Sequence, residues 1–591
     1  MSDISSLVTD NIDLWTSAIE KKSSSGRGSS KKISLHGIKK LRELILELAV
    51  RGKLAPQDPS DEPASVLLEK IQAEKEQLIK EKKIRKAKPL PSISEDDKPF
   101  KITKGWSWTR FNDVFDVRDG THDSPKYESN GYPLVTSKNL YSGSLDLSNV
   151  KYINEKDYLK ILERSKVDVG DILFAMIGSI GNPVLVENEP EFAIKNMALF
   201  KHYIKDLLPP RFLQIYLELS ADKMKENAAG GVQSFVSLTF LRTYLFPLPP
   251  LAEQHRIVAK VDELMALCDQ LEKETEDQIE AHQTLVKTLL NTLTESKDAE
   301  ELSQNWQRLR DHFDTLFTTE DSIDELKQTI LQLAVMGKLV PQDPNDEPAS
   351  VLFEKIQAEK ERRQKLPKDD PEYLKKQKAL PPITEDEKPF DLPDGWEWVI
   401  LDEICTISGG KRLPKGHSLQ KEQTPHIYIR VSDMKNGTIS NLDLHYLSDE
   451  TFNQISKYTI SSEDIYMTIV GATIGKCGLV PNEFNNMNLT ENAAKVSPIL
   501  TDKTFLYKCM DSPYLQSQFI DKTKKVGVEK MSLIRFKSSF FALPPLAEQH
   551  RIVTKVDELM AICDKLKSRL SESQQTQLHL ADTIVEQSVR V

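Results

Sequence analysis

Two long segments of this chain occur twice, and this duplication constrains the fold more than any other feature of the sequence. Residues 41–76 align without a gap to residues 326–361 and agree at 28 of 36 positions. Residues 248–272 and 543–567 agree at 21 of 25 positions, and both begin with LPPLAEQHRIV. An internal repeat of this strength predicts that one structural unit is built twice along the chain.

The segments that separate these repeats, in contrast, differ from each other. The motif KPF followed by GWxW opens both of them, and beyond it the similarity nearly vanishes. We call the repeated parts the frames and the divergent parts the first insert (residues 106–250) and the second insert (residues 396–545). Identical frames are expected to bind two copies of one partner, whereas different inserts are expected to bind two different targets. A structural protein with neutrally drifted loops is the alternative, but drift would have changed the frames as well.

The frames have the pattern of amphipathic helices. Apolar residues recur three and four positions apart after each LPP sequence, where the prolines suit the first turn of a helix. The helix that includes residues 41–50 is expected to end at Gly52, and its copy at Gly337, because glycine is the favoured residue after a helix C-terminus. We also expect a helix from Ala64 to about residue 86, a short helix around Trp15 and a flexible linker at residues 21–32.

Two paired helices cannot hide every apolar position of the frames. The surplus stripe is therefore predicted to dock helices of a partner. The predicted partner interface consists of Ile257, Val261, Leu264 and Cys268 in the first copy and Ile552, Val556, Leu559 and Cys563 in the second.

Composition limits the class of protein. A chain of 591 residues suggests roughly four units. No stretch of 18 apolar residues is present, so no membrane span is expected. We find no secretory signal, and five cysteines without a CxxC pair are typical of reduced thiols and give no zinc site, so we expect a cytoplasmic protein. The net charge is −11, but the inserts carry only about −2 and about +1, so the acidic excess lies on the frames.

Both inserts are expected to be mixed α/β modules. The segments at 171–178 (DILFAMIG) and 464–471 (DIYMTIVG) predict a buried strand that leads into a turn. GATIGK at 471–476 is similar to a phosphate-binding loop, but only three residues separate its glycines. Cys477 also stands where that loop requires serine or threonine. We therefore predict a tight strand-to-strand turn at this position.

Polar loops shaped by glycine and proline are the candidate DNA-binding parts of the inserts. Arginine or lysine suits guanine, and asparagine or glutamine suits adenine, in the major groove. Lysine and arginine also neutralise phosphates. A histidine such as His122 or His417 is, taken alone, more often a surface residue than a catalyst. The candidate DNA-binding residues are Arg118, Thr121, His122, Lys126, Ser137, Lys138 and Asn139 in the first insert and Lys411, Arg412, Lys415, His417, Arg430 and Ser432 in the second.

No catalytic motif is present in the sequence. GxSxG, HExxH and GxxxxGK[ST] are missing. LPPL has leucine where the tetrad of amino-methyltransferases, Asn-Pro-Pro-aromatic, needs asparagine. The sequence thus predicts no catalytic, cofactor-binding or metal-binding residue in this chain.

With LPPLAEQHRIV and PQDP in both frames, and LAVRGKL in the first frame matched by LAVMGKL in the second, the chain resembles the specificity (S) subunits of type I restriction-modification systems over nearly its whole length. The repeat PQDP–DEPAS–EKIQAEK ahead of each insert resembles the type IB, EcoAI-like branch. The resemblance implies an α+β fold in which long antiparallel helices separate two α/β target recognition domains, arranged as a tandem repeat with pseudo-two-fold symmetry.

The same resemblance implies a non-catalytic subunit that reads a bipartite, asymmetric sequence in double-stranded DNA. Its frames would bind two modification subunits, which methylate adenine, and restriction subunits would then join. S-adenosylmethionine, Mg and ATP are expected on those partners and not on this chain. The rival interpretations are a self-sufficient DNA methyltransferase or nuclease, and a coiled-coil scaffold without DNA binding. The expected domains are 1–34 (N-terminal segment and linker), 35–105 (first frame), 106–250, 251–395 (central helical spacer and second frame), 396–545 and 546–591 (C-terminal helix).

Overall fold

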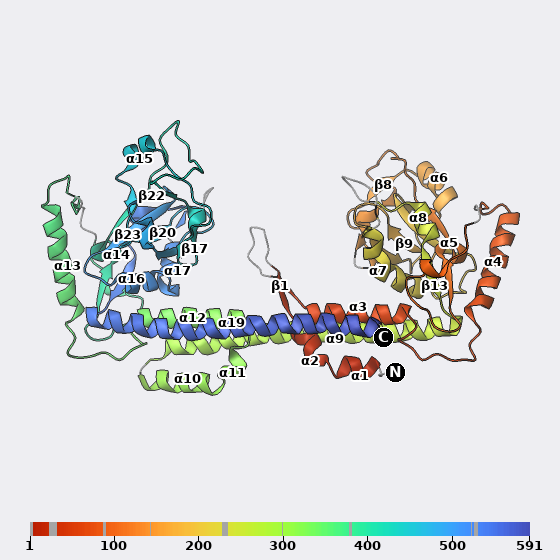
Figure 1. The fold of residues 1–591 in the computed structure, drawn as a ribbon, viewed down its shortest axis with the longest axis horizontal. Coiled ribbons are helices and arrows are strands. Elements are labelled where there is room, and N and C mark those ends of the chain that lie inside the picture. The colour runs from red at the N-terminus through yellow and green to blue at the C-terminus, as the bar shows by residue number, and fades with distance from the viewer. Residues whose placement is uncertain are drawn as a thin grey trace. The chain divides into compact units, whose positions relative to one another are not determined.

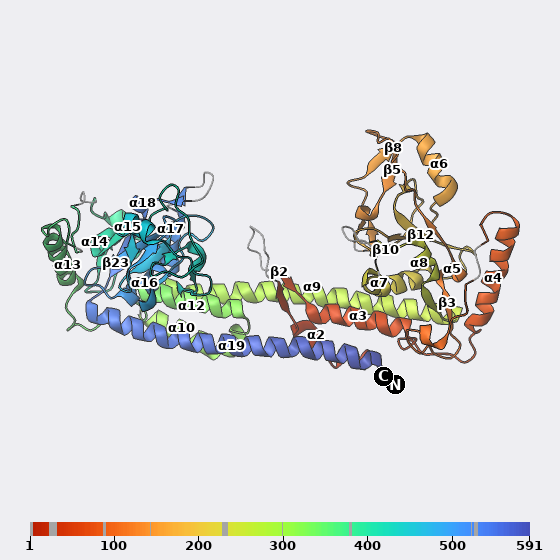
Figure 2. The ribbon, with the colours of Figure 1, turned by 45° about the horizontal axis from the view of Figure 1, so that its top comes forward.

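The computed structural model forms two compact units. Unit 1 comprises residues 1–278 together with 573–591, and unit 2 comprises residues 279–572. Figures 1 and 2 show the elements of each. Part of the linker expected at 21–32 lies outside the described residues. The structure describes residues 4–22, 32–86, 90–141, 143–226, 228, 235–297, 299–370, 372–376, 381–521, 523–524 and 530–590.

The frame of unit 1 is helical, as the sequence pattern predicts. Instead of one short helix around Trp15, two form, and the Trp15 side chain is fully buried between them and the rest of the frame. Gly52 has a φ of +68° and follows the first long helix as predicted, while the amide of Lys53 donates to the Leu48 carbonyl over 2.9 Å. The elements are α1 (Ile4–Thr9), α2 (Ile12–Ser17), β1 (Glu20–Lys22), β2 (Lys32–Ser34), α3 (His36–Val50), α4 (Ala64–Lys80) and the first part of α9 (Leu251–Glu295).

Helix α4 ends earlier than the predicted residue 86. Lys82 adopts a φ of +58°, and the amide of Lys83 turns back to the Leu78 carbonyl over 2.9 Å. A residue in the left-handed region ends a helix because the next amides can no longer reach carbonyls four residues back.

The first insert folds around two sheets. A four-stranded antiparallel sheet has the order β10-β9-β12-β4, a three-stranded sheet has the order β11-β5-β8, and β3 pairs with β13 where the chain enters and leaves. All four residues of β9 are buried, as predicted for this segment. The elements are β3 (Ser107–Arg110), α5 (Phe111–Val114), β4 (Phe115–Asp119), β5 (Tyr132–Val135), β6 (Leu140–Tyr141), β7 (Ser144–Leu145), β8 (Lys151–Ile153), α6 (Glu155–Ser165), β9 (Ile172–Ala175), β10 (Gly181–Leu185), β11 (Ala193–Ile194), β12 (Met197–His202), α7 (Pro210–Glu226), α8 (Leu238–Thr243) and β13 (Leu245–Leu248).

Unit 2 repeats this plan. Its frame contains α10 (Ala299–Asp311), α11 (Phe313–Leu316), α12 (Glu320–Val335), α13 (Ala349–Gln364), the end of α9 and most of α19 (Leu546–Arg590). The second insert contains β14 (Glu397–Ile400), α14 (Leu401–Ile404), β15 (Cys405–Gly409), β16 (Tyr428–Ile429), β17 (Met434–Lys435), β18 (Thr438–Ile439), α15 (Asp449–Ile455), β19 (Thr459–Ile460), β20 (Ile465–Thr468), β21 (Cys477–Leu479), β22 (Met487–Leu489), β23 (Ala493–Pro498), α16 (Lys503–Met510), α17 (Pro513–Asp521), β24 (Thr523–Lys524), β25 (Lys530–Met531), α18 (Leu533–Lys537) and β26 (Phe540–Leu543).

The two inserts share a topology although their sequences have diverged. The four-stranded sheet of the second insert has the order β15-β23-β20-β21, which matches β4-β12-β9-β10 strand for strand. The strands on either side of both glycine turns are antiparallel neighbours, with Gly181 opposite Ala175 and Cys477 opposite Met467. The predicted strand-to-strand turn at GATIGK is therefore confirmed. Each unit is a mixed helix-and-sheet module on long helices, built twice along the chain.

The long helices belong to the frames. Within the ranges described above, none of the helices combines the length and the apolar character that a membrane span requires.

The glycines that follow α3 and α12, Gly52 and Gly337, offer a stability test. An alanine Cβ at Gly337 (φ +68°) would lie 2.4 Å from Pro393 Cγ and 3.0 Å from the Trp396 ring. We expect Gly337→Ala to lower the free energy of unfolding by roughly 2–5 kcal/mol, the sum of about 1–2 for the left-handed backbone and about 1–3 for overpacking. Chemical denaturation of the purified chain measures it.

Gly416→Ala is the matched control in the same unit. Gly416 also has a positive φ (+90°), but nothing lies within 4 Å of its added Cβ. Its cost should be only the backbone part, about 1–2 kcal/mol. Equal losses in the two variants would contradict the role given to the contact with Pro393 and Trp396.

Candidate nucleic-acid interface

Each insert is fixed to its frame by a buried hydrogen bond between the two repeated motifs. The Trp106 indole donates to Glu253 Oε2 over 2.9 Å, and Trp396 donates to Glu548 Oε2 over 3.0 Å. The tryptophans belong to GWxW, and the glutamates to LPPLAEQHRIV. Burial raises the pKa of both glutamates above the ordinary value, although the indole N–H opposes the shift. These motifs are the same in both copies because they make the same junction.

An ion pair joins the remaining repeated motif to the same junction. Arg256 contacts Asp61 over 2.5 Å, and Arg551 contacts Asp346 over 2.5 Å. Both aspartates belong to the DEPAS segment, which starts the helix ahead of the insert. The DEPAS segment, the long helix that begins with LPPLAEQHRIV and the first strand of the insert thus meet at one point.

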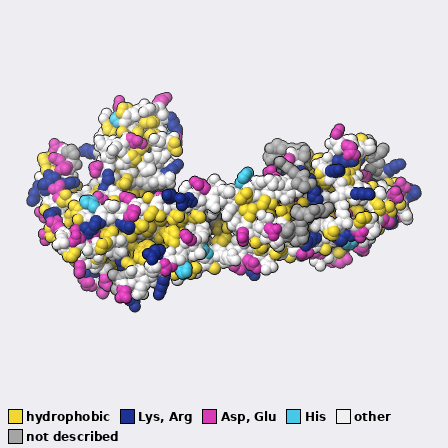
Figure 3. Space-filling model, turned by 60° about the horizontal axis from the view of Figure 1, so that its bottom comes forward, with side chains coloured by type: hydrophobic (Ala, Val, Ile, Leu, Met, Phe, Trp, Pro, Cys, Tyr) yellow, Lys and Arg dark blue, Asp and Glu magenta, His cyan; other side chains and the backbone are white. Residues whose placement is uncertain are grey.

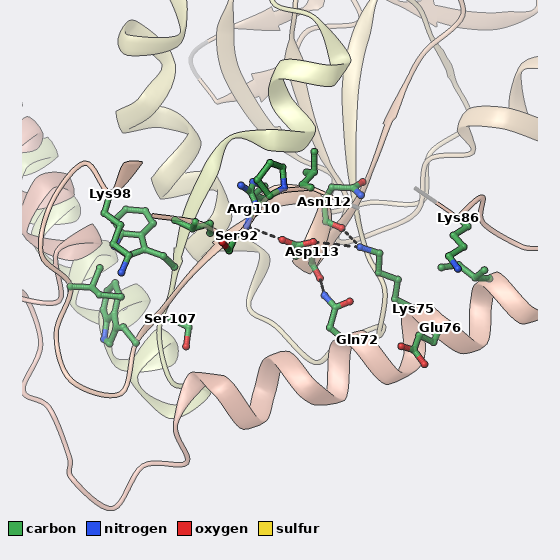
Figure 4. Close-up of a pocket in the computed structure, with 17 residues that line it drawn as sticks. Gln72, Lys75, Glu76, Lys86, Ser92, Lys98, Ser107, Arg110, Asn112 and Asp113 are labelled. Carbon is green, nitrogen blue, oxygen red and sulfur yellow. Dashed lines mark hydrogen bonds and ion pairs between the residues drawn. The ribbon is translucent and has the colours of Figure 1, made fainter. Parts of the chain in front are cut away.

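Helices α4 and α13 brace the inserts from the side. In unit 1, Gln72 donates to the Asp113 carbonyl over 2.8 Å and Lys75 to the Asn112 carbonyl over 2.5 Å, at the end of α5 (Figure 4). A cation suits the C-terminal carbonyls of a helix. Burial lowers the pKa of Lys75 despite Asp113 nearby. In unit 2, Gln357 and Lys360 make the same contacts with the end of α14.

A cavity of about 790 Å³ lies between α4, residues 90–102 and β3 (Figure 4). Lys75, Lys86, Lys98 and Arg110 contribute to its wall. None of the candidate DNA-binding residues lines it. The cavity therefore belongs to the contact between α4 and the first insert, and not to the candidate interface.

The predicted partner interface on the long helices requires a correction. Its residues are buried by the chain itself: seven of them have relative exposures from 0% to 5%, and Leu559 packs against the same core. Helix α3 lies along α9, where Arg42 contacts Glu272 over 2.6 Å, and α12 lies along α19, where Lys567 contacts Asp324 over 2.7 Å (Figure 1). The periodicity of the sequence could not reveal that α3 and α12, which belong to the same frames, cover this apolar stripe. The buried residues are Ile257, Val261, Leu264, Cys268, Ile552, Val556 and Cys563.

The candidate DNA-binding loops leave the sheets at equivalent glycines. Gly120 follows β4 and Gly410 follows β15, and their amides donate to the carbonyls of Met197 and Ala493. An alanine Cβ would lie 2.5 Å from the Ile194 carbonyl oxygen at Gly120 and 2.2 Å from the Leu489 carbonyl oxygen at Gly410. Each loop therefore starts against the neighbouring strand, a path that requires glycine.

In the first insert, a buried carboxylate organises the start of the loop. Asp119, which is 7% exposed, contacts His122 Nε2 over 2.8 Å and also bonds to Arg164 on α6. Nδ1 of His122 lies 3.0 Å from Asn196 Oδ1. Burial alone would raise the pKa of Asp119, but the hydrogen bonds from Arg164 and His122 hold it below the ordinary value. The aspartate is therefore charged at neutral pH.

The other candidate residues of the first insert differ in exposure. Arg118 is paired with Asp116 over 2.6 Å, whereas Lys126 and Lys138 are exposed. Thr121 accepts a hydrogen bond from the amide of Asp123 over 3.2 Å. Ser137 is half-buried in the 3-10 helix Ser137–Asn139.

Asn139 has a structural role that its sequence context does not reveal. Its side chain is buried, accepts from the Thr136 amide over 2.9 Å and donates to the Asp146 carbonyl over 3.0 Å and to the Asn149 carbonyl over 3.3 Å. Both amide hydrogens are thus used inside the insert, so this side chain holds the turn.

The second insert builds the same turn with a carboxylate. Asp433 stands at the position of Asn139, in the 3-10 helix Val431–Asp433, and accepts from the Arg430 amide over 2.8 Å. Arg430 also donates to both Asp433 oxygens and to Asp443, and its NH1 lies 3.3 Å from His445. Most of its donors are engaged. Ser432 is exposed beside it.

In the loop after Gly410, Arg412 forms an ion pair but is still largely exposed. Its side chain is 81% exposed, and Nε donates to Glu491 Oε1 over 2.7 Å. Lys411 lies 5.3 Å from the centre of the Tyr458 ring, Lys415 is exposed, and His417 Nδ1 lies 2.7 Å from Thr451 Oγ1. The structure thus gathers these residues around the strand ends, but their contacts with DNA stay a prediction.

Sequence reasoning missed the side chains that hold these loops. Asp119 and Arg164 are 45 residues apart, and Arg412 and Glu491 are 79 apart. No spacing rule relates such pairs, because the sheet brings them together. The sequence signals such a pair only through its residue types: a buried acid at the end of a strand, and an arginine in the last turn of a helix.

Charged side chains of both signs are mixed on the surface drawn in Figure 3. On the face drawn in Figure 3, acidic and basic side chains of each unit are interspersed and form no broad area of one sign. Among the described residues, no group of histidine, cysteine, aspartate and glutamate is placed to hold a metal ion.

Comparisons with known proteins agree with this two-module plan. The family model of the type I restriction modification DNA specificity domain matches residues 103–281 and 393–573. The EcoAI specificity subunit of Escherichia coli is 39% identical over 613 residues, covering 99% of this chain and 100% of that protein. The EcoEI specificity subunit of Escherichia coli is 38% identical over 611 residues, covering 99% of both. The HsdS subunit from Thermoanaerobacter tengcongensis, known from a crystal structure, is 19% identical, and the match covers 83% of this chain and 98% of that chain with a TM-score of 0.38.

The buried glutamates predict a pH dependence of stability. Because burial raises the pKa of Glu548, this carboxyl binds a proton more readily in the folded chain than in the unfolded chain. The wild-type free energy of unfolding therefore loses a contribution as pH rises through the window above the ordinary glutamate pKa. Glu548→Gln keeps an acceptor for Trp396 and lacks this titration, so its stability relative to wild type should increase from acid to neutral pH.

Denaturation of both proteins across that pH window measures the effect. Glu361→Gln, at an exposed position on α13, is the control and should run parallel to wild type. A difference between Glu548→Gln and wild type that does not change with pH would contradict the explanation.

Proposed function

Because the chain belongs to the family of type I restriction-modification DNA specificity subunits, in the branch that includes EcoAI and EcoEI, we propose that it reads a split, asymmetric DNA sequence. Each insert reads one half-site. The observation that carries this proposal is the contrast within one chain: the inserts have the same strand order but differ in the side chains at their strand ends. Two inserts with the same strand order and different residues in their loops suit two different half-sites.

The frames serve as the scaffold for partner subunits. Two equivalent frames support binding of two modification subunits, which supply adenine methylation, and restriction subunits join the assembly. The docking surface lies on faces of the frames other than the buried stripe. S-adenosylmethionine, Mg and ATP belong to these partners.

The chain itself is proposed to be non-catalytic. All five cysteines are buried, and burial raises the pKa of Cys268 to about 11 and the pKa of Cys405 still further. Such thiols are poor nucleophiles. Buried side chains such as Asp119 organise the loops of the inserts. With DNA as the target, the proposed location is the cytoplasm.

We also propose a pseudo-two-fold relation between the units. Helix α9 starts in unit 1 and ends in unit 2, while α19 starts in unit 2 and ends in unit 1. Val286 and Ala581 occupy the same position along the two helices, and both are buried in the unit that receives the helix end. Such reciprocal exchange supports the proposed symmetry of the repeat.

Methylation mapping tests the function. We expect expression of the chain with its modification subunit, in a host without adenine methylation, to produce methyladenine in a single split sequence with two different halves. Long-read sequencing of the host DNA measures it. Methylation by the purified chain alone would identify a self-sufficient methyltransferase, and an unmethylated genome with no footprint on DNA would favour a scaffold without DNA binding.

Reciprocal glycine variants test the assignment of half-sites to inserts. Gly120→Ala and Gly410→Ala each force one loop away from the neighbouring carbonyl. We expect each variant to weaken selection of one half-site, by about tenfold or more per disturbed base contact, and to leave the other half unchanged. Loss of selection at the same half-site in both variants would contradict the assignment.

A further inference from the structure

Both inserts hold an exposed arginine on an acidic side chain at the start of the candidate loop. Resting on the proposed function, we propose that these acid-held arginines, Arg164 on Asp119 in the first insert and Arg412 on Glu491 in the second, each read a guanine of their half-site. Asp119 and Glu491 are positioning residues. Arg164 lies on α6, outside every loop that the sequence singled out.

Among the described residues, the Arg164 guanidinium bonds to Asp119 alone, which leaves most of its donors free for a ligand. Its NH2 group bonds to Asp119 Oδ1, and it shares that carboxylate with His122, whose Nε2 contacts Oδ2. The side chains of Arg164 and His122 are 59% and 58% exposed, whereas Asp119 is buried. Arg164 lines a depression of about 330 Å³ with Thr121 and Lys160. The carboxylate thus fixes two donors that still face outward.

The second insert shows that the fold does not need this cluster. Asp119 pairs with Ala198 in the sheet, and Gly409 pairs with Ala494 at the matching position of β15. The same strand forms with no side chain at that position. The buried aspartate is therefore an addition specific to the first insert, as expected of a group that sets what the insert recognises.

Arg412 is held in a comparable way by different residues. It stands two positions after Gly410, as His122 stands two positions after Gly120. Glu491 accepts from Arg412 Nε, and it is itself approached by Tyr428 Oη at 3.4 Å and Thr490 Oγ1 at 3.3 Å. Among the described residues, neither terminal nitrogen of Arg412 has a hydrogen-bond partner. The end of the guanidinium, with two parallel N–H groups, is free.

The chemistry of these pairs favours a base edge over a phosphate. The acidic partner cancels much of the charge of the guanidinium, so the pair gains less from counterion release at a phosphate than a free lysine or arginine does. The directional N–H groups remain, and they match the O6 and N7 acceptors of guanine. Holding the side chain in place also reduces the entropy lost on binding.

The position within each unit is compatible with this role. In unit 1, α6 lies at the end of the insert away from α3 and α9, and in unit 2, α15, near the strand ends of the second insert, lies away from α12 and α19 (Figures 1 and 2). The frame helices therefore do not cover either end in its own unit.

Selection from a random duplex library tests the proposal. The chain, assembled with modification subunits, is incubated with the library, and the bound DNA is sequenced to give base frequencies at each position. We expect Arg164→Gln to lower the preference for one guanine of one half-site by about 5- to 100-fold, and Arg412→Gln to do the same at one guanine of the other half-site. Asp119→Asn should relax the same position as Arg164→Gln, and the double variant should add little.

Control variants separate this role from simpler ones. Arg211→Gln removes an arginine that is also held by acids, Glu218 and Asp262, but lies on α7 away from the loops, and it should leave every base frequency unchanged. Arg164→Lys keeps the charge but not the fork, so it should not restore the guanine preference.

Three results would overturn the inference. The first is that Arg164→Gln and Arg412→Gln select the wild-type sequence with unchanged frequencies. The second is a uniform loss of binding at unchanged frequencies, which indicates a phosphate contact or a structural role. The third is full rescue by Arg164→Lys. If wild type itself selects no split sequence, the proposed function fails instead, so the two failures are distinguishable.

Discussion

The placement of each insert on its frame depends on one buried hydrogen bond, from a tryptophan indole to a glutamate in the first turn of a long helix. Around it, the arginine of LPPLAEQHRIV contacts the aspartate of DEPAS, and Gln254 and Gln549 each donate over 3.0 Å to a proline carbonyl ahead of the helix. A buried carboxylate is costly without partners, so a change in any of these residues leaves a polar group unsatisfied. This mutual dependence explains why the repeated motifs stayed alike while the inserts diverged. What is conserved between the two halves is an attachment point.

Beyond this junction, the inserts are free to vary where variation costs little stability. Both keep the strand order and the glycine at which the loop departs, since either change would disturb the sheet. The turn at Asn139 and Asp433 varies more between the inserts. A side-chain amide and a carboxylate can cap the same backbone N–H groups, but they need different neighbouring residues. Around the loops, each insert holds an exposed arginine on an acid, but with different residues: Asp119 binds Arg164 and His122 in one insert, and Glu491 binds Arg412 in the other. Variation increases with distance from the frame.

Much of the fold was accessible from the sequence because it depends on local signals. Glycine after a helix, proline in a first turn and an apolar run before a glycine turn all act within a few residues, and Gly52, Gly337 and the turn after β20 were predicted correctly on that basis. Contacts between distant residues were not accessible. The stripe that includes Ile257 and Val556 has the periodicity of a docking surface, and only the packing of α3 and α12 shows that it is covered. For the same reason Asn139 was predicted to face DNA and proved to be buried, and Arg164 was missed.

The exchange of helix ends between the units has a consequence for how the chain is made. Unit 1 includes residues 573–591, where Asp582 lies 3.0 Å from His36 Nε2, so this contact can form only after that segment has been synthesised. Unit 2 contains the end of α9, which is translated before most of the unit. During vectorial synthesis, the face of α3 that contacts α19 therefore stays exposed to solvent until α19 has been made. The segment of α9 that unit 2 contains, in contrast, is already present when the rest of unit 2 is synthesised.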